Sequence, residues 1–316
     1  MRWFIEQGNQ SGYGYHLDLV NSLTLLGAAW FVWLSIEISR SSIPPQIQAI
    51  QIKAYRFFPK GFEWRIIAFF TGALLIVNSA TGVFLAPNLA LPGRELVVTG
   101  SIIQLVIGLL FFSRRTFAIA GFLILILAIP LAAFYIPTSL LIDYGFEFIA
   151  LALAFILIGL DGNHNSRAAG SDRKYCPEGI DRLALPITRM GLGMTLITLA
   201  IHGKLIDPDL ALTFLDQHDL NFMPLLGFSS FTNLHFAFAS GVAELVFGLL
   251  LLGGIATRFV TAVLSVFLTI PLFVLGPAEL IGHLPLFGVA LLLIIRGSGG
   301  YYLTIGNGAG RRPLPA

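Results

Sequence analysis

Apolar residues gather along this chain in runs of about 18–22 residues, with short polar stretches between them. A helix needs about 20 predominantly apolar residues to cross a bilayer. The pattern therefore predicts an all-α integral membrane protein of about nine transmembrane helices. The expected spans lie near Val20–Ile38, Ile66–Leu85, Leu96–Phe112, Thr116–Tyr135, Ser139–Leu160, Ile187–Ile201, Thr232–Gly253, Phe259–Leu275 and Glu279–Ile295. The first and sixth runs are the weakest, so a count of eight stays open.

The composition argues against a water-soluble protein. Of 316 residues, 56% are hydrophobic and 11% are charged, whereas soluble domains carry about 25% charged residues. The net charge of +2, with basic residues dispersed among the loops, argues against a nucleic-acid partner. Cys176 is the only cysteine, which excludes an intrachain disulfide and a cysteine-based metal site. Residues 1–18 lack the pattern of a cleavable signal peptide, so we expect the helices themselves to direct insertion into the lipid bilayer.

Arginine and lysine fall in alternate loops, and this predicts the orientation, because cytoplasmic loops carry the excess of these residues. The basic loops contain Arg40, Lys53, Arg56, Lys60, Arg114, Arg115, Arg167, Arg173, Lys174, Arg182, Arg258, Arg311 and Arg312. The loops between them are neutral or acidic and contain Arg94, Glu95, Asp143, Asp207, Asp209, Asp216, Asp219 and Glu279. With nine spans, this alternation places the N-terminus outside and the C-terminus in the cytoplasm.

A polar linker divides the chain, and the two sides share a pattern. Gln104, followed by Gly108, corresponds to Glu244, followed by Gly248, at an offset of 140 residues (244 − 104). Ile129-Pro130-Leu131 with Ile270-Pro271-Leu272, and Pro137 with Pro277, follow in the same order. Such matches indicate a duplication into tandem parallel four-helix repeats. The predicted parts are an N-terminal helix with a basic loop (1–60), a first repeat (61–160), a cytoplasmic linker (161–184), a second repeat (185–300) and a tail (301–316).

Short motifs mark the ends of the helices in the second repeat. They are Arg189-Met190-Gly191-Leu192-Gly193, His202-Gly203-Lys204, Glu244-x3-Gly248-Leu249-Leu250 with Thr257-Arg258, Gly282-His283-Leu284-Pro285-Leu286 and Arg296-Gly297-Ser298-Gly299-Gly300. With these motifs the second repeat resembles a DoxX-type four-helix membrane domain. The first repeat resembles it more loosely, since Gln104 stands where the family pattern has Glu. The resemblance implies a multi-pass protein of the bacterial inner membrane, related to the DoxD-type subunit of a thiosulfate:quinone oxidoreductase or to other redox complexes.

Glu244 is the foremost candidate for chemistry. An ionisable side chain in the middle of a span costs about 2.5–3.5 kcal/mol on insertion scales, so something must offset it. One reading is a proton relay or a quinone-contacting carboxylate. The other is a structural tie to Lys204, His202 or a buried amide, and Gln104 at the matching position favours this structural role.

Five further polar residues are expected near the outward ends of the spans in the second repeat. They are His202, Lys204, His235, Glu279 and His283. With Glu244, His202 and His283 are the candidates for proton transfer, and His235, Lys204 and Glu279 are the candidates for cofactor contact. Three imidazoles could also ligate a metal or haem, but no spacing places two histidines on one helix face, so three separate spans would have to converge and no metal site is predicted. Lys204 precedes Asp207 and Asp209, so we expect it to extend to the membrane surface and pair there.

Asp143 and Glu147 lie four residues apart, on one face of a helix if that stretch is helical. A shared face could bind a cation, but their place at the end of an external loop predicts that water solvates both.

Three functions stay open at this stage. The first is a quinone-interacting or redox-associated membrane subunit, which would be part of an oxidoreductase and would have a membrane or soluble redox partner. A quinone is the cofactor that this first function would require. The second is a small-solute transporter, since internal repeats and polar residues inside spans recur in transporters. The third is a non-catalytic scaffold that docks a partner protein.

Overall fold

The computed structural model describes residues 15–41, 61–86, 89–160 and 181–298. All regular structure in these ranges is helical, which confirms the predicted all-α class. Six of the described helices are long and apolar enough to cross a membrane. They are Leu19–Arg40, Phe62–Thr81, Arg114–Tyr135, Thr138–Leu160, Leu183–Ile206 and Asn233–Gly253. The chain is therefore a multi-pass membrane protein whose apolar helices face a lipid bilayer.

A helix occupies each of the nine predicted spans. The helices are α1 (Leu19–Arg40), α3 (Phe62–Thr81), α4 (Arg94–Leu110), α5 (Phe117–Leu123) with α6 (Ile129–Tyr135), α7 (Thr138–Leu160), α8 (Asp181–Ala200), α10 (Asn233–Gly253), α11 (Thr257–Leu275) and α12 (Pro277–Arg296). Three of these nine, α4, α11 and α12, fall outside the six, since α4 has 17 residues and the described apolar parts of α11 and α12 are shorter than 18. Nine spans thus stay a prediction.

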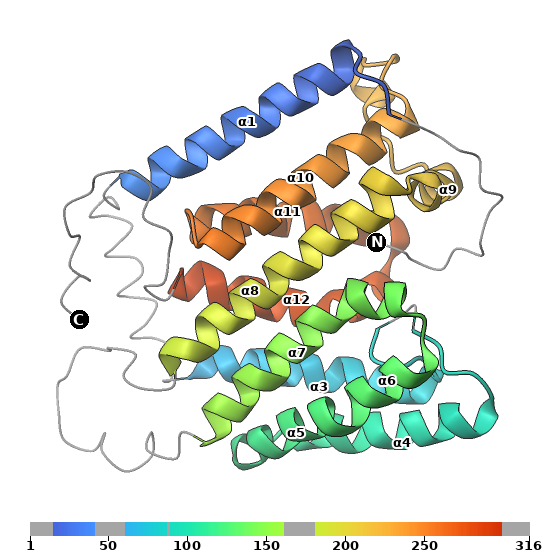
Figure 1. The fold of residues 1–316 in the computed structure, drawn as a ribbon, viewed down its shortest axis with the longest axis vertical. Helices are drawn as coiled ribbons and strands as arrows, with labels where there is room; N and C mark the ends of the chain where they lie inside the picture. The colour runs from blue at the N-terminus through green and yellow to red at the C-terminus, as the bar shows by residue number, and fades with distance from the viewer. Residues whose placement is uncertain (1–14, 42–60, 87–88, 161–180, 299–316) are drawn as a thin grey trace.

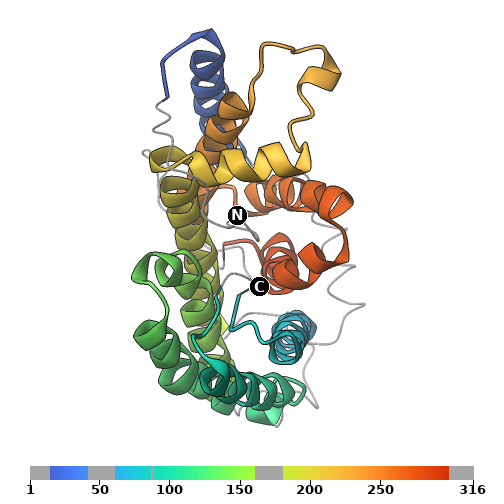
Figure 2. The ribbon, with the colours of Figure 1, turned by 90° about the vertical axis from the view of Figure 1, so that its right-hand side faces the viewer.

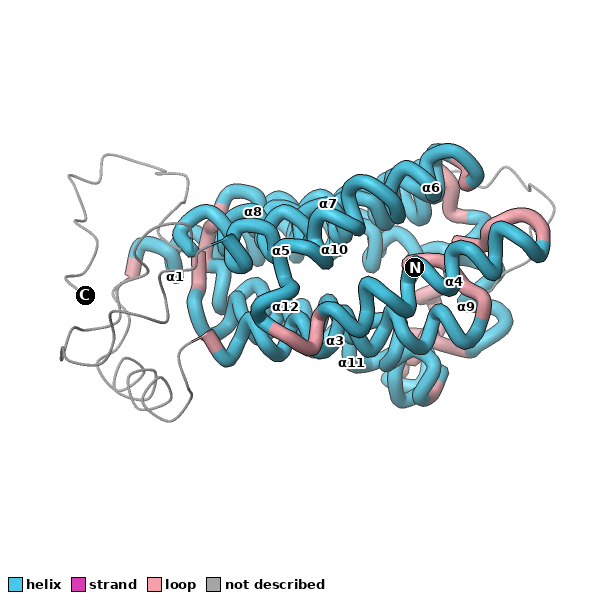
Figure 3. The backbone as a smooth tube through the Cα atoms, turned by 90° about the horizontal axis from the view of Figure 1, so that it is seen from below, coloured by secondary structure: helices cyan, strands magenta, loops and turns pink. Residues whose placement is uncertain are grey.

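Eight of these helical segments form a flattened ring, and the end-on view shows it as two columns (Figure 2). Around the ring, α3 packs on α4, α4 on α5, α5 on α7, α7 on α8, α8 on α10, α10 on α11, α11 on α12, and α12 returns to α3. The helix α1 lies outside the ring against α10 (Figure 1). Seen from below, the helices of the two columns run roughly along the same direction (Figure 3).

The ring has two close crossings of the same kind, each made by a pair of glycines. A Cβ added at Gly108 of α4 would lie 2.9 Å from the carbonyl oxygen of Gly72 on α3. A Cβ added at Gly248 of α10 would lie 2.7 Å from the carbonyl oxygen of Gly193 on α8. Both contacts are too short for any side chain, so glycine is required for these helices to pack closely.

The predicted span near Ile66–Leu85 ends four residues early in the structure. Gly82 adopts a left-handed conformation (φ 76°) and terminates α3. Beyond it, Leu85 is also left-handed (φ 61°) and is held by side chains: its N–H donates to Oε1 of Gln104 (2.6 Å), and its carbonyl accepts from Nδ2 of Asn78 (2.8 Å). The apolar run therefore continues past the helix as a buried loop, which hydrophobicity alone does not separate from a helix.

The sixth span is longer than predicted. The helix α8 begins at Asp181 and continues through a π-helical turn, η4 (Ile201–Ile206). Pro186 lies in the interior of α8, so it does not mark the start of this helix. The predicted linker 161–184 thus overlaps α8 in its last residues, and residues 161–180 lie outside the described part of the chain. A second π turn, η2 (Ile124–Ala128), joins α5 to α6 just before Pro130, which lacks an N–H.

A short helix, α9 (Asp209–His218), follows η4 at one end of the bundle and was not predicted. Its Ala211, Phe214 and Leu215 are buried, so it covers this end of the fold. We call this end of the bundle the α9 end; it includes Asp18, which precedes α1, and the start of α10.

Candidate functional site

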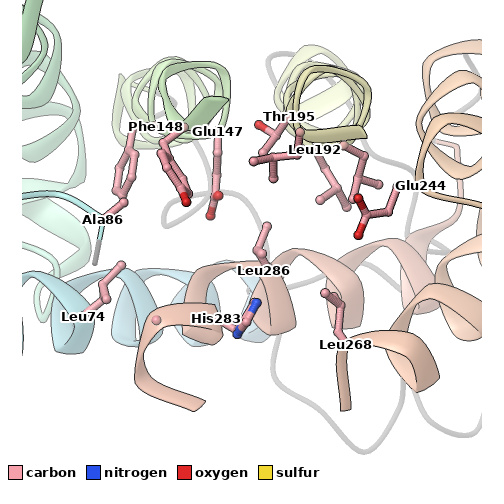
Figure 4. A pocket seen from close by; sticks show the side chains of 14 residues that line it. Leu74, Ala86, Glu147, Phe148, Leu192, Thr195, Glu244, Leu268, His283 and Leu286 are labelled. Carbon is pink, nitrogen blue, oxygen red and sulfur yellow. The ribbon is translucent and has the colours of Figure 1, made fainter. Parts of the chain in front are cut away.

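A cavity of about 50 Å³ lies inside the ring, between the two halves of the chain. The helices α3, α7, α8, α10, α11 and α12 all contribute to its wall. Most of the lining is apolar, and its polar side chains are Tyr144, Glu147, Thr195, Glu244 and His283. In Figure 4, Glu147 and Thr195 enter from one side, Glu244 from the neighbouring helix and His283 from the opposite side. Acid–base groups from three helices, α7, α10 and α12, therefore meet around one small space.

Glu147 is the most isolated of these groups. It lies on α7, only 8% of it is exposed, and no hydrogen bond to its carboxylate is present among the described residues. The expectation that water solvates Asp143 and Glu147 at a loop end is wrong: α7 begins at Thr138 and packs on α8, so Asp143 is fully buried. The available signal was the place of Glu147 inside the apolar run Ser139–Leu160, which should have marked it as intramembrane.

Glu244 is held by one strong contact, which uses one of its two carboxylate oxygens. Nζ of Lys204 lies 2.6 Å from its Oε1, which is the structural tie offered above as one reading of this residue. Its Oε2 is buried and has no hydrogen-bond partner among the described residues. The expectation that Lys204 extends to the surface and pairs with Asp207 or Asp209 is wrong. Only 7% of its side chain is exposed, because η4 turns it inward toward α10.

The close approach of η4 and α10 has a local cause. A Cβ on Gly241 of α10 would lie 3.0 Å from Cβ of Lys204. Glycine at this position lets the lysine stem pass α10 closely enough for its ammonium group to reach Glu244, one turn further along the helix. The backbone carbonyl of Lys204 also accepts a hydrogen bond from the hydroxyl of Tyr15, which ties the segment before α1 to η4. Burial raises the pKa of Tyr15 to about 12, so this hydroxyl keeps its proton at neutral pH.

His202 points away from Lys204 and contacts the other half of the chain. Its Nδ1 lies 3.2 Å from Oδ1 of Asp143 on α7. The side chain of His202 is 38% exposed, whereas Asp143 is fully buried. The pair therefore joins a half-exposed imidazole at the α9 end to a carboxylate in the interior.

The remaining candidates, His235, His283 and Glu279, lie at different places in the fold. His235 lies at the start of α10, where it forms a capping box with Thr232, and its Nε2 lies 2.7 Å from Oδ2 of Asp18. His283 is 2% exposed and lines the cavity. Glu279 belongs to α12, but its side chain lies outside the described part of the chain. The outward polar residues thus form distinct contacts, and the described residues include no group of three His, Cys, Asp or Glu side chains that could hold a metal ion.

The size of the cavity limits what it can hold in this arrangement. A cavity of about 10–15 Å³ holds one water, whereas an engineered cavity of about 150 Å³ binds benzene. A volume of about 50 Å³ thus has room for a few waters and not for a quinone ring.

At the opposite end, arginines hold the helix termini together. Nε of Arg296 on α12 lies 2.5 Å from Oε1 of Glu63 on α3, and both side chains are buried. Arg258 donates to the carbonyls of Ile294 and Ile295 near the end of α12. Cations next to the last carbonyls of a helix stabilise its C-terminus. These contacts serve packing, and none of them faces the cavity.

Fold and site together define the class: a multi-pass α-helical membrane protein with ionisable side chains buried around a small internal cavity. No family model, no curated protein and no solved structure matches the chain. The likeness to DoxX-type proteins therefore stays a prediction from the motifs.

Proposed function

We propose that this chain is a DoxX-type, redox-associated membrane subunit linked to a quinone, and that its cavity takes up and releases the protons of the redox reaction. One observation carries the proposal: Glu147 and Glu244, from the two halves of the chain, line the same buried cavity. Carboxylates in such surroundings are where membrane proteins keep proton relays. A purely structural site would not need two of them.

Quinone chemistry supplies the demand for protons. Reduction of a quinone to a quinol takes up two electrons and two protons. In the proposal, the electrons come from a membrane or soluble redox partner and the protons pass through the cavity, with Glu147, Glu244 and His283 as the groups that hold them. Since the closed cavity is too small for a quinone ring, the quinone binds next to it or enters only when the surrounding helices move apart.

The finer architecture is part of the same proposal. It has nine spans in the bacterial inner membrane, with the N-terminus outside and the C-terminus in the cytoplasm. It also has two tandem parallel repeats after one N-terminal helix. The repeats are supported by two matching features: the Gly72–Gly108 and Gly193–Gly248 crossings, and the packing of the last helix of each half on the first helix of the other.

A small-solute transporter is the second candidate. The observation that favours it is the position of the cavity between the two halves, because transporters often bind their substrates at the interface of their repeats. A transporter needs a cavity that opens alternately to either side, whereas a redox subunit needs only a path for protons and electrons.

The decisive experiment asks whether a quinone or chromophore stays with the purified protein. We would record the absorption spectrum and analyse the extracted lipids by mass spectrometry for the wild type, Glu244→Gln and His283→Ala, with Glu37→Gln, an exposed carboxylate on α1, as the matched control. We expect a bound quinone in the wild type and the control that is depleted in the two cavity variants. Absence of quinone from every form, together with solute uptake by reconstituted vesicles, would replace the redox function by transport.

A further inference from the structure

A series of acid–base groups runs from the α9 end of the molecule to the cavity. It begins at His202, whose side chain is 38% exposed and whose Nδ1 lies 3.2 Å from Oδ1 of the fully buried Asp143. Asp143 lies one helical turn before Glu147 on α7, so their Cβ atoms are about 5–6 Å apart. Glu147 then lines the cavity. Each step is short enough for a direct contact or for one bridging water.

The direction of each side chain follows from the π turn η4. His202 and Lys204 are two residues apart, so they point to different faces of the helix. Lys204 reaches α10, where its ammonium group is committed to Glu244. His202 reaches α7 instead, where Asp143 lies. One turn of helix thus serves a fixed ion pair on one face and an imidazole–carboxylate pair on the other.

We propose that His202 and Asp143 form the route by which protons enter the cavity from the α9 end and reach Glu147. This inference rests on the proposed function and adds the entrance to it. A proton taken from water by the imidazole leaves Nδ1 for the Asp143 carboxylate, which gives neutral imidazole and a carboxylic acid. The proton then passes from Asp143 to the Glu147 carboxylate, which restores the Asp143 anion. No electrons move, and the charge that enters the cavity is one proton.

The surroundings of Glu147 favour a proton as the cargo. Besides Asp143, one turn away on α7, the ionisable groups around Glu147 are three that line the cavity with it, Tyr144 on the same helix, Glu244 on α10 and His283 on α12, together with Lys204, the partner of Glu244. Lys204 is the only basic aliphatic side chain among them, and it is paired with Glu244. A metal ion would require several converging ligands, which the described residues do not offer. Glu147 itself, 92% buried and without a hydrogen bond among the described residues, is the terminal acceptor.

The test follows the proton on Glu147 in the full-length protein. After a pH jump, time-resolved infrared spectroscopy records the carboxylic acid band, and Glu147→Gln identifies that band by its loss. We expect Asp143→Asn and His202→Ala to slow the appearance of the band by about tenfold or more, since a positioned acid–base group contributes about 10²–10⁴-fold to a proton transfer. Added imidazole should restore the rate in His202→Ala, which a merely structural role would not predict. Asp207→Asn, at an exposed carboxylate of the same end, is the matched control and should match the wild type.

Each outcome has a distinct meaning. If the band appears at the wild-type rate in His202→Ala and Asp143→Asn, the entrance is elsewhere and this inference is wrong. If Glu147→Gln removes no band at any pH at which the protein stays folded, Glu147 exchanges no proton, and the proposed function fails together with the route. His202 is half-exposed, so its variant should fold even if Asp143→Asn does not, and it decides the question alone.

Discussion

Gln104 on α4 and Glu244 on α10 occupy matching places but carry different chemistry. Each lies one turn before a glycine, Gly108 or Gly248, that packs directly on a glycine of the preceding long helix. Gln104 is fully buried, and both ends of its amide bind the backbone: Nε2 donates to the carbonyl of Val83 (2.8 Å) and Oε1 accepts from the N–H of Leu85. Glu244 instead pairs with a lysine, and its second oxygen has no hydrogen-bond partner in the described part of the chain.

The difference indicates that packing at this place does not require a charge. A neutral amide satisfies the α4 site completely. An ion pair at the α10 site must overcome the desolvation of both groups, and a buried ion pair is often no more stable than apolar residues of the same shape. The charge at Glu244 therefore supports a functional role beyond packing. The following changes break or sharpen this comparison, beginning with the largest expected effect.

Lys204→Met should be the most damaging change, because it leaves the Glu244 carboxylate buried without its cation. We expect the free energy of unfolding to fall by about 3–5 kcal/mol, as for other broken buried pairs. Equilibrium unfolding in detergent micelles measures the loss. The double variant Lys204→Met/Glu244→Gln removes both charges and should recover most of it. Arg40→Met, at the exposed pair with Glu37, is the control and should change stability by less than about 1 kcal/mol. Equal stability of Lys204→Met and the wild type would mean that the contact between Lys204 and Glu244 does not stabilise the fold.

Gln104→Leu tests the uncharged α4 site, again by equilibrium unfolding in detergent micelles. It leaves the carbonyl of Val83 and the N–H of Leu85 without their partner, and a buried unpaired polar group costs about 1–3 kcal/mol. Glu244→Leu, combined with Lys204→Met, should be tolerated better than Gln104→Leu, because it leaves no buried backbone group unpaired. If the double variant loses more stability than Gln104→Leu, the ion pair stabilises the fold more than the amide does. The argument that the charge at Glu244 serves function would then be wrong.

Gly108→Ala and Gly248→Ala ask whether the two places share the same backbone geometry. The added methyl groups would lie 2.8 Å and 2.7 Å from the side chains of Ile76 and Ile197, and they would also meet a carbonyl oxygen. Each variant should lose about 1–3 kcal/mol of stability, as for other overpacked sites. Gly27→Ala on α1 is the control, because no atom lies within 4 Å of its added Cβ. A large loss at one crossing and none at the other would contradict the equivalence.

Much of this fold could be predicted from the sequence, because apolar runs long enough to span a bilayer indicate helices that lie in lipid. All nine runs are helices. The ends of the helices were harder to predict. The apolar run continues past Thr81 into a buried loop, and only the side-chain contacts of Gln104 show where α3 stops.

The candidate site was predictable only in part. Glu244 was found because a carboxylate in the middle of a span is unusual. Lys204 was misplaced because neighbouring aspartates suggested a partner, whereas η4 turns it toward Glu244. Contacts such as His202 with Asp143 join residues that are far apart in the chain, and no local pattern reports them.

The smallest effect is expected at the pair of Asp18 and His235, which is more exposed than the pair of Glu244 and Lys204. His235 lies at the start of α10, the helix that carries Glu244. Asp18 accepts a hydrogen bond from the N–H of Asn21 and lies against His235, and these contacts hold the pKa of Asp18 below its ordinary value. A lowered pKa means that the stabilisation is present above the ordinary pKa of about 3.9 and is lost as the pH falls through the lower folded value.

Asp18→Asn isolates the charge, because asparagine caps a helix about as well as aspartate. The wild type should melt slightly above this variant near pH 6, and the two melting temperatures should converge as the pH falls below about 4. Salt should also narrow the gap, since an exposed pair is screened, whereas the loss in Lys204→Met should not respond to salt. A gap that persists at low pH and high salt would mean that the Asp18 contact acts through its shape and not its charge.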